Sequence, residues 1–360
     1  MTIFNEPILV TRPYLPPLEE FKRGCEEIWT NRWLTNDGPM LQRFHEALSG
    51  YLGVPSSNLA LFANGTLALE LGFYAMGLSG GDVITTPFTF VATSHALKRI
   101  GATPVFADVD PATLCLSPAA AERSITPRTK AIVPVHVYGN PCDVDGFARL
   151  GEKYGVKIIY DAAHAFGTDL HRYGDISMFS FHPTKLFHSC EGGCLVFRDD
   201  SLQRKLFNLR NFAIESELAC VDVGTNAKMN ELQALMGLLC LERMDDLLAS
   251  RRRIAGIYAE KFRGTCVRFI DGSANAAYCP VLFKSYEIRE RVYAGLKKSN
   301  IHARRYFYPL LTEFAPYIYA RGTCPVAADA ASRVLTLPTY YGLADEDVRS
   351  IADNVLEIVS

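Results

Sequence analysis

The feature that most restricts the fold is a regular alternation of short apolar runs with amphipathic runs, beginning at Asn58. It passes through "LALFA", "TLALELGFYAMGL", "DVITTP", "FVATSHALKRIG" and "TPVFADV", and returns in "AIVPVHVY", "VDGFARLGEKYG" and "VKIIYD". This order indicates strand, helix, strand. Repeated units of this kind build a mostly parallel sheet with helices on both faces. We therefore predict a three-layer α/β fold whose ligands lie outside the carboxyl ends of the strands.

The pattern changes after a long helical stretch from Met229 to Phe262, where shorter strands and helices follow. A chain of 360 residues that is 49% hydrophobic is too long for one ordinary core and too apolar for disorder. We therefore predict an N-terminal arm and large domain over residues 1–250, and a smaller C-terminal α+β domain over residues 251–360.

Composition and charge exclude several classes of function. The 37 basic and 39 acidic residues give a formal charge of −2, and no basic run is interleaved with aromatic residues, so we expect no nucleic-acid partner. No segment reaches the roughly 18 apolar residues of a membrane span, and the first residues do not resemble a signal peptide. The 10 cysteines form no C-x-x-C pair, which suits a reducing compartment. We expect a cytoplasmic protein without a membrane partner.

The first candidate strand end is "FANGTLAL", in which Gly65 and Thr66 lie between a strand and a helix. Free amides at a helix N-terminus, a hydroxyl and a glycine that allows close approach can bind an anion. A tight turn with an N-cap is the alternative reading. No G-x-G-x-x-G or G-x-x-x-x-G-K-[ST] motif occurs, so the anion is not predicted to belong to a dinucleotide or a nucleoside triphosphate.

Two further strand ends carry titratable side chains. Asp161 ends the apolar run "VKIIYD", and His164 follows it in "DAAHAFG". Asp161 either caps a helix or pairs with a cation, because a buried carboxylate needs a cationic partner. In "SMFSFHPTK", Ser180 precedes Lys185 in a loop that also holds histidine, glutamate and paired glycine.

The fourth strand end, "TTPFTFVAT", supplies an aromatic face, because Phe88 and Phe90 flank Thr89. Either ring could instead belong to the core. A phosphate site, a flat aromatic face, a carboxylate and a lysine amine at neighbouring strand ends together match pyridoxal 5'-phosphate. The sequence therefore predicts this cofactor.

The same segments resemble the sugar aminotransferases of the DegT/StrS family, which are pyridoxal phosphate enzymes of the aspartate aminotransferase fold, fold type I. The resemblance runs from about Trp33 to near the C-terminus. It rests on "RWLTNDGPM", "NGTLAL", "PFTFVAT", "ATPVFADVDP", "DAAHAFG", "SFHPTKLFHSCEGG", "GTNAKMNELQA", "RRYFYPLL" and "LTLPTYYGL". It implies an enzyme that moves an amino group from L-glutamate to a nucleotide-linked keto sugar.

The resemblance also implies a role for each candidate residue. Lys185 would hold the cofactor covalently and carry protons, Asp161 would pair with the pyridine nitrogen, and His164 would lie near the phenolic oxygen. Phe90 would stack on the ring.

The phosphate would be held by Gly65, Thr66 and Ser180 of one chain and by Asn226 of a second copy. The resemblance therefore implies a homodimer with shared active sites.

Two departures from the family pattern bear on the substrate. Lys228 stands where arginine is usual in the family. Any bidentate contact that an arginine makes there with a phosphate or carboxylate would become a contact with the single charged group of lysine. The block "TKLFH", with Leu186 after the lysine, resembles enzymes that aminate the 4-position of dTDP-4-keto-6-deoxyhexoses. His182 fits the same group, because enzymes that aminate the 3-position more often have tyrosine there. We expect His182 and Lys228 to contact that substrate, for O-antigen, lipopolysaccharide or related glycan biosynthesis, with 3-amination as the alternative.

Two other classes remain open. A zinc or iron hydrolase could draw ligands from His164, His171, His182, His188, Asp161, Glu191 and Cys190, although no H-E-x-x-H or paired C-x-x-C occurs, and we predict no metal. A non-catalytic regulator could keep the fold, but the loss of Lys185 or Asp161 that would mark it is not seen.

Overall fold

The computed structural model describes residues 1–270 and 272–360, and its largest element is a seven-stranded sheet of order β2-β8-β7-β6-β5-β3-β4. Every neighbouring pair is parallel except those of β8, which runs antiparallel to β2 and β7. The predicted mostly parallel α/β fold is confirmed. The strands are β2 (Leu59–Phe62), β3 (Asp82–Thr85), β4 (Thr103–Phe106), β5 (Thr129–Val133), β6 (Lys157–Asp161), β7 (Ile176–Ser180) and β8 (Gly193–Phe197).

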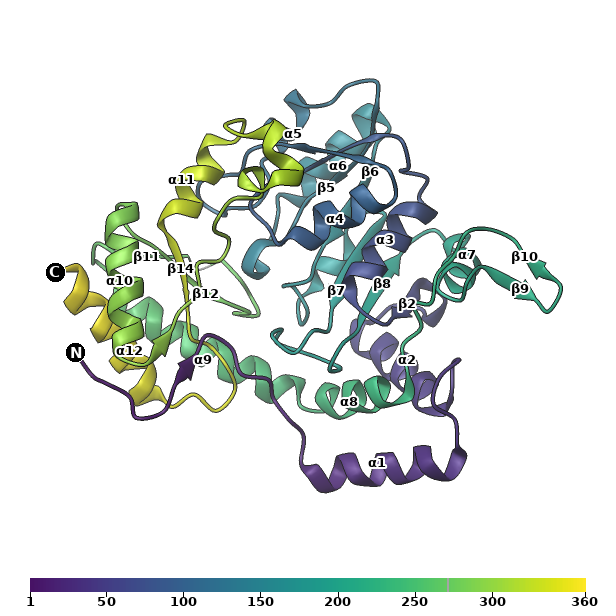
Figure 1. Ribbon diagram of the computed structural model, residues 1–360, viewed down its shortest axis with the longest axis horizontal. Helices are drawn as coiled ribbons and strands as arrows, with labels where there is room; N and C mark the ends of the chain where they lie inside the picture. Colours follow the sequence, from purple (N-terminus) through teal and green to yellow (C-terminus); the bar gives the residue numbers. More distant parts are fainter. Residues whose placement is uncertain (271) are drawn as a thin grey trace.

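Helices cover both faces of this sheet because its strands are apolar on both sides (Figure 1). In β2, Leu59 and Leu61 face one core, whereas Ala60 and Phe62 face the other, as the two-residue period of a strand requires. The helices of this region are α2 (Pro39–Leu52), α3 (Gly65–Ala75), α4 (Val91–Arg99), α5 (Pro118–Arg123), α6 (Val144–Tyr154), α7 (Leu202–Leu209) and α8 (Glu231–Leu241). Helices α3, α4 and α7 pack in one core with the sheet, and α2 and α8 pack in another.

The long helical stretch predicted from Met229 to Phe262 is two helices. Asn230 caps α8 through its side chain, which accepts a hydrogen bond from the Gln233 amide, so the helix begins at Glu231. Helix α8 ends at Leu241, and α9 spans Met244–Phe262.

A smaller three-stranded antiparallel sheet of order β11-β12-β14 lies in the C-terminal part. Its elements are β11 (Arg268–Phe269), β12 (Cys279–Leu282), α10 (Tyr286–Lys298), β13 (Ile301–His302), α11 (Pro325–Arg333), β14 (Val334–Leu337) and α12 (Asp345–Val359). Short 3-10 helices are η1 (Ser56–Asn58), η2 (Val137–Gly139), η3 (Asp169–Arg172), η4 (Leu311–Glu313) and η5 (Ala315–Ala320). Helix α9 passes through residue 250 without a break, so the division at 250/251 stays a prediction.

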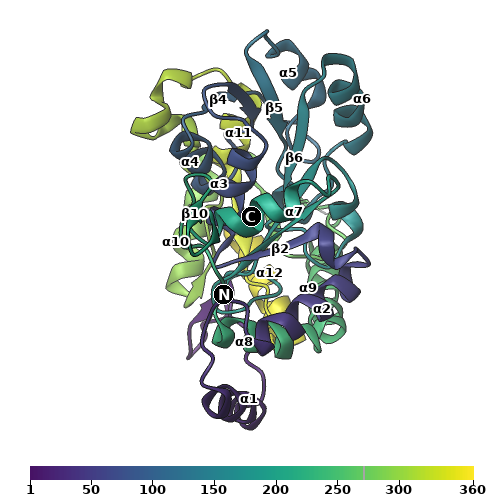
Figure 2. The ribbon, with the colours of Figure 1, turned by 90° about the vertical axis from the view of Figure 1, so that its right-hand side faces the viewer.

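The N-terminal arm joins the C-terminal part rather than the large sheet. Strand β1 (Ile8–Leu9) pairs in parallel with β13, and the Thr2 amide donates a 2.7 Å hydrogen bond to Asn354 Oδ1. Both ends of the chain therefore lie beside the smaller sheet (Figure 1). The arm leads into α1 (Leu18–Asn31), which packs on α8 and buries only Ile28 (Figure 2).

A hairpin of β9 (Ile214–Ser216) and β10 (Ala219–Cys220) projects from the body of the molecule after α7 (Figure 1). Taken with the residues that follow β10 up to Val223, this hairpin carries apolar side chains that face solvent in the single chain: Leu218 is 98% exposed and Val223 is 81% exposed. Within residues 1–270 and 272–360, no helix combines the length and the apolar character that a membrane crossing requires.

Candidate active site

A cavity of about 620 Å³ opens at the carboxyl ends of the large sheet's parallel strands. The predicted site residues that line it are Gly65, Thr66, Phe90, Asp161, His164, Ser180, His182 and Lys185. Asn226 and Lys228 do not line it. The structure therefore brings together all the predicted residues except the two that follow the hairpin.

Sheet topology explains this arrangement. Asp161 is the last residue of β6, Ser180 is the last of β7, Gly65 begins α3 after β2, and Phe90 directly precedes α4 after β3. Because β2, β3, β6 and β7 point the same way, their carboxyl ends meet at one edge. We call the part of the cavity at Asp161 and His164 the ring end, and the part at residues 64–66 and Ser180 the phosphate end.

Asp161 lies at the bottom of the ring end with 4% of its surface exposed. Burial raises the pKa of its carboxyl, and three contacts oppose that rise: a 2.7 Å hydrogen bond from Thr93 Oγ1, a 3.1 Å bond from the Ala163 amide, and the charge of Lys185. A carboxylate in this environment favours a cationic partner. It therefore fits a protonated pyridine nitrogen.

Lys185 reaches the same cavity from the loop after β7. Its Nζ donates a 3.5 Å hydrogen bond to the Tyr278 hydroxyl and lies 5.9 Å from the centre of that ring. The charge of Lys185 lowers the pKa of Asp161 and contributes to lowering that of His164. The amine is thus positioned to attack a carbonyl group or to move a proton within the cavity.

Burial, with a smaller contribution from Lys185, holds the pKa of His164 well below its usual value, which favours the neutral ring. Its Nδ1 accepts a 3.1 Å hydrogen bond from the Tyr138 amide, which leaves the proton on Nε2. The ring can therefore donate a hydrogen bond to an oxygen in the ring end.

At the phosphate end, the Asn64 side chain accepts a 2.9 Å hydrogen bond from the Leu67 amide and caps α3. The predicted N-cap is thus present, and Gly65 and Thr66 of the same turn line the cavity. A β-carbon on Gly65 would lie 3.0 Å from Ser180 Cβ, so only glycine lets these segments approach so closely. The helix N-terminus and the Thr66 and Ser180 hydroxyls suit a phosphate group.

Between the two phenylalanines, the structure favours Phe90 as the cavity's aromatic face. Phe90 lines the cavity and is 53% exposed, whereas Phe88 is fully buried against Tyr138 and Phe307. With an amine, a buried carboxylate, an anion site and an open aromatic ring, the donor set fits pyridoxal phosphate.

The two residues outside the cavity lie in the segment after the hairpin. Asn226 is exposed and pairs through its backbone with Asn211, and Lys228 Nζ donates a 2.6 Å hydrogen bond to Asn211 Oδ1. Asn226 does not cap the helix that follows it, because the side chain of Asn230 caps α8.

Several cavity residues were not predicted. Arg304 and Glu191 line the cavity, and Glu191 lies 3.7 Å from His182, whose pKa is lowered by burial despite that carboxylate. The block "RRYFYP" suggests Tyr306 and Tyr308 for the sugar pocket, with packing as the alternative, and of these two Tyr306 lines the cavity; the same block was the available signal for Arg304.

The structure also shows where the candidate metal ligands named from the sequence lie. Within the part of the chain that the structure describes, no three histidine, cysteine, aspartate or glutamate side chains are placed to hold a metal ion. His171 and His188 each bond a backbone carbonyl instead, those of Leu52 and Tyr14.

Comparisons with known proteins agree with this geometry. The model of the DegT/DnrJ/EryC1/StrS aminotransferase family matches residues 18–356. The dTDP-4-amino-4,6-dideoxy-D-glucose transaminase of Shigella dysenteriae is 42% identical over 98% of this chain and 100% of that protein, and the Escherichia coli protein of the same name is 37% identical over 98% and 99%. The solved structure of DesI with its TDP-sugar product superposes with a TM-score of 0.92, at 35% identity, covering 100% of this chain and 95% of that one.

Proposed function

Because this chain belongs to the DegT/DnrJ/EryC1/StrS aminotransferase family and is a pyridoxal phosphate-dependent aminotransferase, we propose that it aminates C4 of a dTDP-4-keto-6-deoxyhexose with L-glutamate as donor. The observation that carries this proposal is that Lys185 and the buried Asp161 face one cavity. The 42% identical relative, matched over its full length, supports the sugar and the position.

When bound, pyridoxal phosphate supplies an electron sink for the negative charge that develops on the carbon bearing the amino group. Asp161 would hold a proton at the ring nitrogen, which increases the capacity of that sink. Its burial strengthens the interaction, because the local dielectric constant is low. Lys185 would hold the cofactor, and its Nζ would take and return the proton at the substrate carbon.

The remaining cavity residues would bind and orient. The Nε2 proton of His164 would hold the phenolic oxygen, and Phe90 would stack on the ring. Gly65, Thr66 and Ser180 would bind the phosphate at the N-terminus of α3.

His182 and Lys228 would contact the nucleotide sugar. Lys228 would do so as a point charge, since it lacks the paired donors of arginine. We place the reaction in the cytoplasm and its product in O-antigen, lipopolysaccharide or related surface glycan synthesis.

The active unit would be a homodimer in which Asn226 completes the phosphate end of the neighbouring chain. Exposed apolar side chains in the single chain support a partner surface. They include Trp29 of α1, which is 67% exposed, and the hairpin residues Leu218 and Val223. Exposed apolar groups of this size are typical of contacts between subunits.

The test is to incubate the purified protein with glutamate and each of a small panel of 3-keto and 4-keto nucleotide sugars. We expect a visible cofactor absorption band that borohydride abolishes, and a product whose new amine lies at C4 by nuclear magnetic resonance. Amination at C3 would overturn the position and leave the aminotransferase activity intact. A protein with the band but no turnover on any sugar would indicate a regulator.

A further inference from the structure

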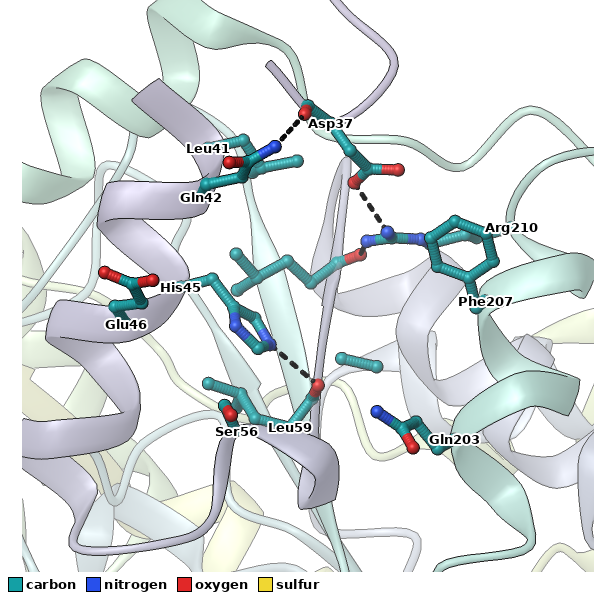
Figure 3. Close-up of a pocket in the computed structure, with 12 residues that line it drawn as sticks. Asp37, Leu41, Gln42, His45, Glu46, Ser56, Leu59, Gln203, Phe207 and Arg210 are labelled. Atoms are coloured by element: carbon teal, nitrogen blue, oxygen red, sulfur yellow. Dashed lines mark hydrogen bonds and ion pairs between the residues drawn. The ribbon is translucent and has the colours of Figure 1, made fainter. Parts of the chain in front are cut away.

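A second cavity, of about 430 Å³, lies along the outer edge of β2 and shares no lining residue with the candidate active site. At one end Arg210 Nη2 lies 2.6 Å from Asp37 Oδ1, in an ion pair between the loop before α2 and the end of α7 (Figure 3). No role in the predicted chemistry accounts for this pair.

Arg210 is unusually buried for an arginine, with 9% of its side chain exposed. Burial lowers its pKa, and Asp37 opposes that shift. Besides Asp37, the guanidinium donates a 2.9 Å hydrogen bond from Nη1 to the Leu61 carbonyl and lies 4.8 Å from the centre of the Phe207 ring. A buried guanidinium that loses Asp37 would be left with an uncompensated charge, so the pair acts as one unit.

The Leu61 carbonyl belongs to β2, just before the phosphate end. Two residues later, the Ala63 amide donates a 2.8 Å hydrogen bond to the Ala227 carbonyl, and the Ala227 amide donates a 2.9 Å bond to the Arg210 carbonyl. Arg210 thus holds β2 with its side chain and residue 227 with its backbone.

These hydrogen bonds hold in place two segments that the proposed function assigns to the binding of the cofactor phosphate. Ala63 immediately precedes residues 64–66, which form the phosphate end of this chain's own site. Ala227 immediately follows Asn226, which we assign to the phosphate end of the second copy. Movement of Arg210 would displace both segments together.

We propose that Asp37 and Arg210 are positioning residues that set the hold of both sites on the cofactor phosphate, an inference that rests on the proposed function. Neither side chain lines the active-site cavity. Because the bonds of Arg210 lead to β2 and Ala227 and not to Asp161 or His164, we expect their effect at the phosphate end and not at the ring end.

The test compares Arg210→Gln with the wild type as full-length holoenzyme, loaded either with pyridoxal phosphate or with pyridoxal, which lacks the phosphate. Loss of each compound on dilution is followed by the visible absorption band. We expect pyridoxal phosphate to dissociate about tenfold faster from the variant, the factor that corresponds to one charge-assisted hydrogen bond, and pyridoxal to dissociate at the wild-type rate.

Two further variants complete the design. Asp37→Asn removes the charge at a position that is 31% exposed, and we expect a change of the same kind but smaller. Arg204→Gln, on the same helix but 76% exposed and paired with Glu215, is the matched control and should change neither rate. Asp37→Asn provides the measurement if Arg210→Gln does not fold.

The proposal is overturned if both compounds dissociate faster by the same factor, because the pair would then support the fold as a whole. It is also overturned if neither rate changes in a folded variant. Failure of the proposed function itself looks different, since the wild-type protein would then keep its absorption band but would not aminate C4 of any keto sugar in the panel, whatever the two dissociation rates are.

Discussion

The two ends of the active-site cavity are constructed in different ways. At the ring end, Asp161 and His164 are 4% and 5% exposed, and their hydrogen bonds come from Thr93, Ala163 and Tyr138 of the same chain. At the phosphate end, Asn226 is exposed, and the hairpin that precedes it carries apolar side chains that face solvent.

This difference indicates which chain's active site a substitution at each end would affect. The hydrogen bonds that hold Asp161 and His164 come from their own chain, so we expect a substitution there to damage only the site of the chain that carries it. The phosphate end would depend on two chains, so a substitution at Asn226 should damage the site of the neighbour.

The largest expected effect is at the ring end. Lys185→Ala should keep the fold and lower turnover by several orders of magnitude, because it removes both the covalent attachment and the proton carrier. Turnover is measured with glutamate and the keto sugar. Lys157→Ala, an exposed lysine paired with Asp175, is the control and should keep wild-type activity. Wild-type rates from Lys185→Ala would contradict the assignment.

Asp161→Asn should lower turnover by about 100-fold, since the amide keeps the shape and loses the charge that holds the ring-nitrogen proton. The absorption band should persist, because Lys185 is intact. A variant that keeps the absorption band but loses turnover would distinguish the role of Asp161 from that of Lys185. A fully active Asp161→Asn variant would show that this charge is not needed.

The phosphate end is tested by mixing chains. Lys185→Ala and Asn226→Ala subunits, each nearly inactive alone, are refolded together in equal amounts. Half of the dimers should then be mixed and have one intact site, which restores roughly a quarter of wild-type activity by the statistics of random two-fold pairing. An unchanged average of the two variants, despite demonstrated subunit exchange, would show that Asn226 does not act across the interface.

The smallest effect is on stability without cofactor. Because burial raises the pKa of folded Asp161, the unfolded chain loses this proton at a lower pH than the folded chain does. The free energy of unfolding should therefore fall as the pH rises from the pKa of the unfolded carboxyl through that of the folded one. Asp161→Asn should not show this decrease. Denaturant titrations at several pH values give the comparison, and parallel curves for the two proteins would contradict it.

The sequence was sufficient to predict that Asp161 and Ser180 lie at one edge of the sheet, because each of them ends a strand. Apolar runs predict strands, and parallel strands place Asp161 and Ser180 at one edge without knowledge of any side-chain contact. The residue pattern alone could not choose between Phe88 and Phe90, because both flank the same strand end; the family resemblance pointed to Phe90, and packing separates the two rings.

Contacts between distant segments escaped prediction for the same reason. Tyr278 reaches Lys185 from the smaller sheet, and Arg210 has the appearance of a surface residue at a helix end. The long helical stretch divides after Leu241, although its apolar pattern continues. These features depend on tertiary packing between distant segments, which intrinsic secondary-structure propensity does not predict.

The pairing of β1 with β13 has a consequence for how the chain is made. Thr2 bonds Asn354, 352 positions further along, so this arm can make its native contacts only after the segment that follows it, up to residue 354, has been translated. During synthesis the arm and α1, with Trp29, have no docking surface from the small sheet.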